Sequence, residues 1–253
     1  MRGLQWFLEA ARAVRQKPLL WLSAALALVV AQGAVVMVWI VMLAAAHEQD
    51  VSVFADAFAA SIMLTPIFLF CSMPLFVAAF SGAARRQFLP HFPGAHPLHR
   101  MLHALGFIVL LAALLYSTFV VIVWMYYSDG SSEFFEILCL CLLVVGLFWL
   151  AFLILLAQVL AACGTPFLYA LARAARAALR PACVVHATAF ATGTIAAFAA
   201  FAALVMFDSP VPHTWLLVLV CSCAFALDAL ITPWLMARDM FGTMPETFNE
   251  PHA

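Results

Sequence analysis

Charged residues are scarce in this chain: they make up 9% of its 253 residues, whereas 68% are hydrophobic. This composition is too apolar for folding around a single water-soluble core, so it indicates an integral membrane protein. The net charge of -1 gives no reason to expect nucleic-acid binding. The seven cysteines lie within or beside apolar runs, so we expect no disulfides, and their spacing does not suit a metal centre.

Motifs that would hold a nucleophile, a base or a metal together are also missing. The sequence contains no Gly-x-Ser-x-Gly, no His-Glu-x-x-His, no Walker loop and no pair of intramembrane aspartates. We therefore expect a protein that is not an enzyme and that uses no cofactor.

Long apolar runs are abundant. A helix needs about 20 apolar residues to cross a bilayer, and six runs reach that length. The predicted fold is all-α, a polytopic membrane domain over residues 1–242 followed by a disordered cytoplasmic tail over 243–253. The predicted transmembrane helices cover about 18–46, 57–84, 102–127, 134–162, 182–207 and 213–236. The first is too long for the apolar part of a secretory signal, so we interpret it as retained.

The basic residues show how these spans are oriented. All 11 lysine and arginine residues fall on one side of the six-span arrangement. The charged residues in the loops on the other side are all acidic. Basic loops are retained in the cytoplasm, so both termini are predicted to be cytoplasmic.

Two short amphipathic stretches, Glu9–Pro18 and Thr165–Pro181, directly precede long apolar spans. Each has basic residues on one helical face, which is typical of helices that lie at the membrane interface. Their similarity suggests a parallel repeat, in which each unit is an amphipathic stretch with two spans. The spans over 102–127 and 134–162 would then form a central hairpin between the units, although short alanine-rich matches also arise by chance. The residues expected to contact anionic lipid headgroups are Arg12, Arg15, Lys17, Arg85, Arg86, Arg173, Arg176 and Arg180.

Asp228 is the one formal charge placed well inside a predicted span, and an ionised acid is costly to bury there. His186 and Gln158 are predicted to lie at a similar depth, in the cytoplasmic third of the membrane. A cluster of these three side chains would be able to relay protons or bind a cation. The alternative is that Asp228 is protonated or hydrogen-bonded and holds helices together.

Histidines gather in the loop before the span at 102–127. His99 and His103 are four residues apart and would share a helix face able to ligate zinc or copper, with His96 nearby. Prolines interrupt this loop, however, and no cysteine or acidic ligand accompanies the histidines. We therefore expect headgroup contact here and no metal.

Three short motifs stand at the ends of predicted spans. They are Arg12-x-x-Arg15-x-Lys17-Pro18-Leu-Leu-Trp21, the Arg173–Pro181 stretch and Ala237-Arg238-Asp239-Met240-Phe241-Gly242. They resemble a family of uncharacterised six-helix bacterial inner-membrane proteins that carries a domain of unknown function. The layout is also similar to the membrane domain attached to some glycerophosphodiester phosphodiesterases. The resemblance implies a location in the bacterial cytoplasmic (inner) membrane, and no established activity.

The leading interpretation is a non-enzymatic scaffold, assembly factor or accessory subunit. Its partners would be the lipid bilayer, anionic headgroups on the cytoplasmic side, and another membrane protein or a second copy. One alternative is a small solute or ion transporter or channel that combines Asp228, His186 and Gln158 with a span broken at Pro66 and Pro74. The other alternative is an immunity-type protein that protects the membrane from a toxin.

Overall fold

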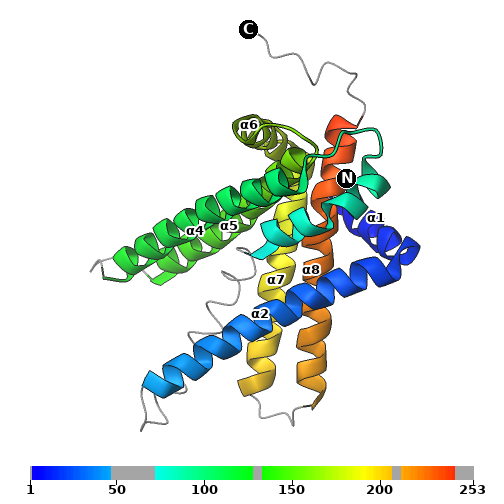
Figure 1. Cartoon of the computed structure of the whole chain (residues 1–253). Helices are drawn as coiled ribbons and strands as arrows, with labels where there is room; N and C mark the ends of the chain where they lie inside the picture. Colours follow the sequence, from blue (N-terminus) through cyan, green and yellow to red (C-terminus); the bar gives the residue numbers. More distant parts are fainter. Residues whose placement is uncertain (1, 47–71, 128–132, 207–211, 243–253) are drawn as a thin grey trace.

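The computed structural model describes residues 2–46, 72–127, 133–206 and 212–242 (Figure 1). All regular secondary structure in these residues is helical, which confirms the all-α prediction. The predicted tail over 243–253 lies outside the described residues, as do Pro66 and most of the predicted span over 57–84.

The helices follow the predicted apolar runs closely. In chain order they are α1 (Arg2–Gln16), α2 (Pro18–Ala46), a helical segment over 72–88, α4 (Pro97–Tyr127), α5 (Glu133–Ala162), α6 (Phe167–Ala178), α7 (Pro181–Met206) and α8 (Pro212–Phe241). The bounds of α2 are those predicted. By contrast, α4 begins at Pro97 rather than at Leu102, and α8 continues past Met236 to Phe241.

Prolines set where four of these helices start. Pro18, Pro97, Pro181 and Pro212 are each the first residue of a long helix. Proline suits this position because the N–H groups of the first turn have no acceptor within the helix, so the N–H that proline lacks costs no hydrogen bond. The φ of proline is also already helical. At Pro18 the chain turns sharply, and α1 meets the first half of α2 at a bend of 111°.

A glycine ends α5 and directs the chain into α6. Gly164 has a φ of 91°, a left-handed conformation that residues with a Cβ atom rarely adopt. The Gly164 N–H donates to the carbonyl of Ala161, and the Thr165 N–H donates to that of Leu160. This pair of bonds is a Schellman motif, which closes a helix and reverses its direction.

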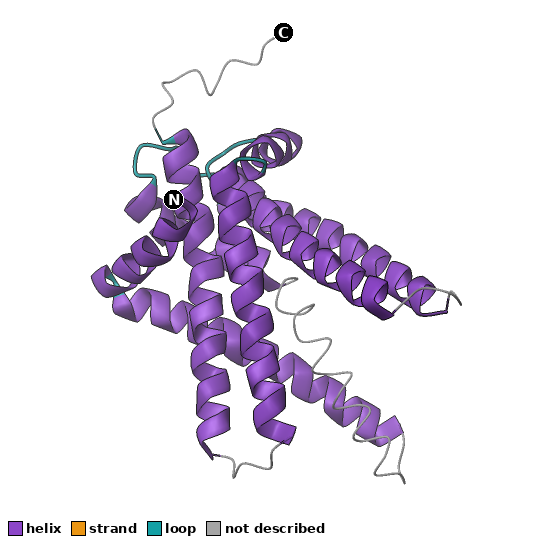
Figure 2. Ribbon diagram, turned by 180° about the vertical axis from the view of Figure 1, so that it is seen from behind, coloured by secondary structure: helices purple, strands orange, loops and turns teal. Residues whose placement is uncertain are grey.

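The helices converge at one end of the molecule and diverge at the other (Figures 1 and 2). The pairs α4–α5 and α7–α8 lie side by side, and α2 crosses α8. At the converging end, α1 contacts α7 and α8, and α6 packs on α5. The two amphipathic helices thus lie at the same end as the basic residues that precede α2 and α7.

The buried core is concentrated at this converging end. The last part of α5 and the residue after it, 151–163, are buried throughout, and Trp6, Trp21 and Trp234 are each 1% exposed. Large apolar side chains also face outward, including Leu19 at 87% and Val109 at 69% exposure. Extended apolar surfaces of this kind are typical of faces that contact lipid or another protein.

Two helical segments in the described residues are long and apolar enough to cross a membrane, Pro97–Leu114 and Leu219–Phe241. A third is obtained if α1 and the start of α2 count together as one bent span. These segments indicate a membrane protein.

Candidate functional site

His186 and Asp228 form a buried pair between α7 and α8. The imidazole Nε2 lies 3.0 Å from Asp228 Oδ2, and the two side chains are 0% and 8% exposed. The hydroxyl of Thr232 donates to Asp228 Oδ1 over 2.6 Å from one turn further along α8. On its other side, His186 Nδ1 lies 3.0 Å from the backbone carbonyl of Gly3 in α1. The pair therefore links three helices.

The partners fix how many protons this site holds. A carbonyl oxygen can only accept, so His186 Nδ1 carries a proton and donates it to Gly3. The close approach of Nε2 to Asp228 Oδ2 then requires one more proton between them, because two lone pairs would repel each other. That proton belongs either to an imidazolium or to a carboxylic acid. In both cases the pair has no net charge, which lowers the cost of burying it.

Aromatic rings enclose the imidazole. Phe7 is stacked on His186 with ring centroids 4.2 Å apart, while Trp6 and Phe152 approach edge-on at 5.8 and 5.1 Å. The start of α1 fits here because Gly3 lacks a side chain: a Cβ at this position would lie 2.3 Å from the carbonyl oxygen of Ala182. Glycine thus permits backbone contact between α1 and α7.

Gln158, the third member of the predicted cluster, is bonded elsewhere. Its amide donates to the backbone carbonyl of Arg100 on α4 over 3.3 Å. Its Oε1 is buried without a hydrogen-bond partner among the described residues. The structure therefore brings together two of the three predicted residues, and it adds Thr232 and the Gly3 carbonyl to them.

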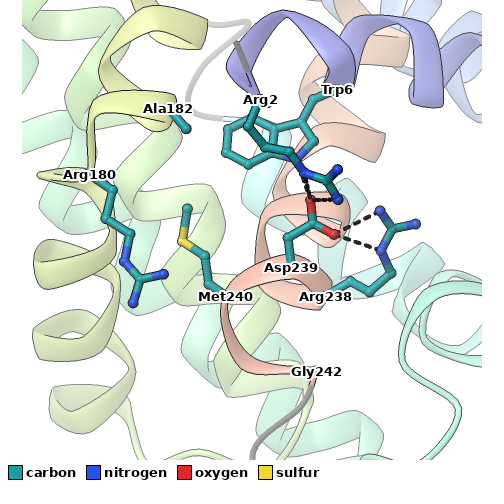
Figure 3. A pocket seen from close by; sticks show the side chains of 8 residues that line it. All are labelled: Arg2, Trp6, Arg180, Ala182, Arg238, Asp239, Met240 and Gly242. Atoms are coloured by element: carbon teal, nitrogen blue, oxygen red, sulfur yellow. Dashed lines mark hydrogen bonds and ion pairs between the residues drawn. The ribbon is translucent and has the colours of Figure 1, made fainter.

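A second polar cluster, which the sequence pattern does not predict, lies at the end of α8. Its centre is Asp239, whose Oδ2 accepts from Arg2 Nε at 2.9 Å and from the Trp6 indole at 2.8 Å (Figure 3). The other carboxylate oxygen, Oδ1, accepts from Arg238, which also pairs with Glu9 of α1. The feature of the sequence that marks this cluster is an acidic residue, Asp239, next to Arg238 in a segment otherwise expected to be basic.

The predicted headgroup-contacting residues differ in how accessible they are. Most are exposed, and these are Arg12, Arg15, Lys17, Arg86, Arg176 and Arg180, whereas Arg85 and Arg173 are half-buried. Arg85 donates to the backbone carbonyl of Phe92, so it holds the histidine-rich loop against the end of its own helix.

The histidines of that loop do not converge with other ligands. His99 and His103 stack with ring centroids 5.8 Å apart, and His96 Nδ1 lies 3.4 Å from the backbone nitrogen of Leu98. Among the residues that the structure describes, no group of three or more histidine, cysteine or acidic side chains is placed to hold a metal ion.

Comparisons of the chain with known protein families, with curated proteins and with solved structures found no match. The His186–Asp228 pair can hold helices together or exchange a proton, and the Asp239 cluster fastens α1 to α8.

Proposed function

We propose that this chain is a non-enzymatic, multi-pass protein of the bacterial inner membrane that acts as a scaffold or accessory subunit. In this proposal the chain crosses the membrane six times and both termini lie in the cytoplasm. The placement of all 11 basic residues on one side of that arrangement supports the topology. The outward apolar surfaces of α2 and α4 support contact with lipid.

The observation that carries the proposal is the complete pairing of the buried His186–Asp228 site. Both imidazole nitrogens and both carboxylate oxygens have partners on α1, α7 or α8. A carrier site needs free ligands that face a path or cavity, whereas these groups are used within the protein. Their arrangement supports a structural role, in which the pair fixes α1 against the membrane helices.

A fixed α1 would present a defined basic surface to partners. Arg12 and Arg15 are exposed on α1, and Arg176 is exposed on α6, which also carries the outward-facing Leu168 and Tyr169. The small residues of α6 face the core instead, and the indole of Trp149 on α5 donates to the carbonyl of the last residue of α6. Exposed cationic and apolar side chains on two anchored helices suit a membrane partner with an anionic or amphipathic cytoplasmic segment.

Site-specific photocrosslinking in native membranes tests this role. A photoreactive amino acid would replace the exposed residues Ala11 on α1 or Ala172 on α6, and Leu105 on the apolar face of α4 would serve as the matched control. We expect one discrete protein adduct from Ala11 and Ala172 and none from Leu105. A protein that is monomeric in native-membrane extracts and forms no adduct from either helix would contradict the proposal.

A flux assay distinguishes the scaffold role from that of a carrier. The purified protein would be placed in proteoliposomes, and proton-coupled ion and solute flux would be compared with that of Asp228→Asn. The scaffold proposal predicts equal flux for the two proteins. A flux that the wild type supports and that Asp228→Asn abolishes would replace the scaffold by a transporter.

A further inference from the structure

A cavity lies where α1, α7 and α8 meet. Its volume is about 600 Å³. Its walls are formed by Arg2, Trp6, Arg180, Ala182, Arg238, Asp239, Met240 and Gly242 (Figure 3). Arg180 stands on one wall, across Met240 from Arg2 and Asp239.

The charges on these walls favour an anion. Three arginines and one acid line the cavity, and both oxygens of that acid, Asp239, are already occupied by Arg2, Trp6 and Arg238. Asp239 therefore has little capacity left to bind a cation. The guanidinium of Arg180 forms no hydrogen bond or ion pair within the part of the chain described, so its donors are available to a ligand.

The start of α7 adds to this preference. Ala182 is the second residue of this 26-residue helix and lies on the cavity wall. The first N–H groups of a helix carry a partial positive charge and bind phosphate readily. In α7 the first residue, Pro181, has no N–H and the N–H of Cys183 donates to the carbonyl of Arg180, so the N–H of Ala182 is the one that faces a ligand. Arg180 immediately precedes the same helix end, so a guanidinium and a helix N-terminus meet at one wall.

We propose that this cavity binds a phosphate group, with Arg180 and the N-terminus of α7 as its main contacts and Arg2 and Arg238 on the facing wall. A planar guanidinium matches two oxygens of a phosphate at once. The cavity is larger than a phosphate ion, and Trp6, Met240 and Ala182 provide apolar walls. These features suit an organic phosphate such as a phospholipid headgroup, and free phosphate shares the same chemistry. This proposal does not depend on the scaffold role.

The test measures thermal unfolding of the full-length protein by tryptophan fluorescence. One arm titrates inorganic phosphate and glycerol phosphate into protein held in an uncharged maltoside detergent. The other arm compares nanodiscs of phosphatidylcholine with nanodiscs that also contain phosphatidic acid. Stabilisation by the soluble phosphates would assign the site to free phosphates. Stabilisation by phosphatidic acid alone would assign it to lipid headgroups.

Arg180→Gln is the test variant and Arg176→Gln is its control. Both arginines are exposed, and Arg176 lies on α6 outside the cavity. We expect Arg180→Gln to weaken binding of the stabilising ligand by about tenfold or more, as is typical when a hydrogen bond to a charged group is lost. Arg176→Gln should leave stabilisation by the soluble phosphates unchanged, and it should lose less of the stabilisation by phosphatidic acid than Arg180→Gln does, because Arg176 does not line the cavity. Equal loss in both variants, or no stabilisation of the wild type by any of these phosphates, would overturn the proposal.

Discussion

Replacing Asp228 by asparagine or by leucine shows whether hydrogen bonds or opposite charges hold Asp228 and His186 together. Asparagine can keep both hydrogen bonds, since its oxygen accepts from Thr232 and its amide donates to Nε2 of a neutral His186. Leucine has a similar size but can make neither bond. The two variants therefore differ in whether a buried polar atom is left without a partner.

The expected cost follows from the atoms that lose a partner. In Asp228→Leu the Nε2 of His186 is left unsatisfied at 0% side-chain exposure, and such a loss costs about 1–3 kcal/mol. Hydrogen bonds between membrane helices contribute about 1.7 kcal/mol at most. We therefore expect Asp228→Leu to lower the free energy of unfolding by about 1–2 kcal/mol, which is about 2–8 °C in the unfolding temperature. For Asp228→Asn we expect a loss of less than about 0.5 kcal/mol, because no buried group loses its partner.

Thermal unfolding in detergent micelles, followed by tryptophan fluorescence, provides the assay. It should be repeated for Thr232→Val, which removes one of the two bonds to Asp228 and should fall between the other two variants. If Asp228→Asn lowers the unfolding temperature as much as Asp228→Leu does, opposite charges on imidazolium and carboxylate stabilise the pair, and the account from hydrogen bonds alone is refuted.

Three further predictions concern other positions. Gly3→Ala should displace α1, because the new Cβ would meet the carbonyl of Ala182 at 2.3 Å, and faster proteolysis within α1 would report it. Gly164→Ala should cost about 1–2 kcal/mol, because φ is 91° there, and unchanged thermal stability would contradict this. Burial raises the pKa of the Cys163 thiol to about 12 despite the nearby charge of Arg85. In a variant with Cys163 as its one cysteine, maleimide labelling at pH 8 should therefore be very slow until detergent denaturation, and rapid labelling of the folded protein would contradict the buried position.

The sequence was sufficient to predict the helices because each carries a local signal. The apolar run of α2 has no charged residue to interrupt it, and a proline marks its start, so its bounds are those predicted. The extension of α8 to Phe241 is not predictable from the sequence, because Arg238 and Asp239 have the charge that is typical of residues leaving the membrane. In the structure their helical turn is held by side chains of α1, a tertiary effect without a local signal.

The candidate site was only partly predictable for the same reason. Depth along a helix placed His186 and Asp228 at one level, and the structure joins them. Depth gives no information about rotation around a helix axis, so it could not show that Gln158 bonds to the carbonyl of Arg100 instead. An amphipathic pattern likewise places α1 at a surface without showing that Gly3 reaches His186.

Cysteine labelling from the two sides of the membrane tests the central claim most directly. In a cysteine-free background, His91→Cys reports on the loop between the segment 72–88 and α4, and Ala172→Cys reports on α6; both positions are exposed. We predict that a membrane-impermeant maleimide labels both cysteines in inside-out vesicles and neither in intact spheroplasts. Labelling of either position in spheroplasts would contradict the one-sided distribution of basic residues and the six-span topology built on it.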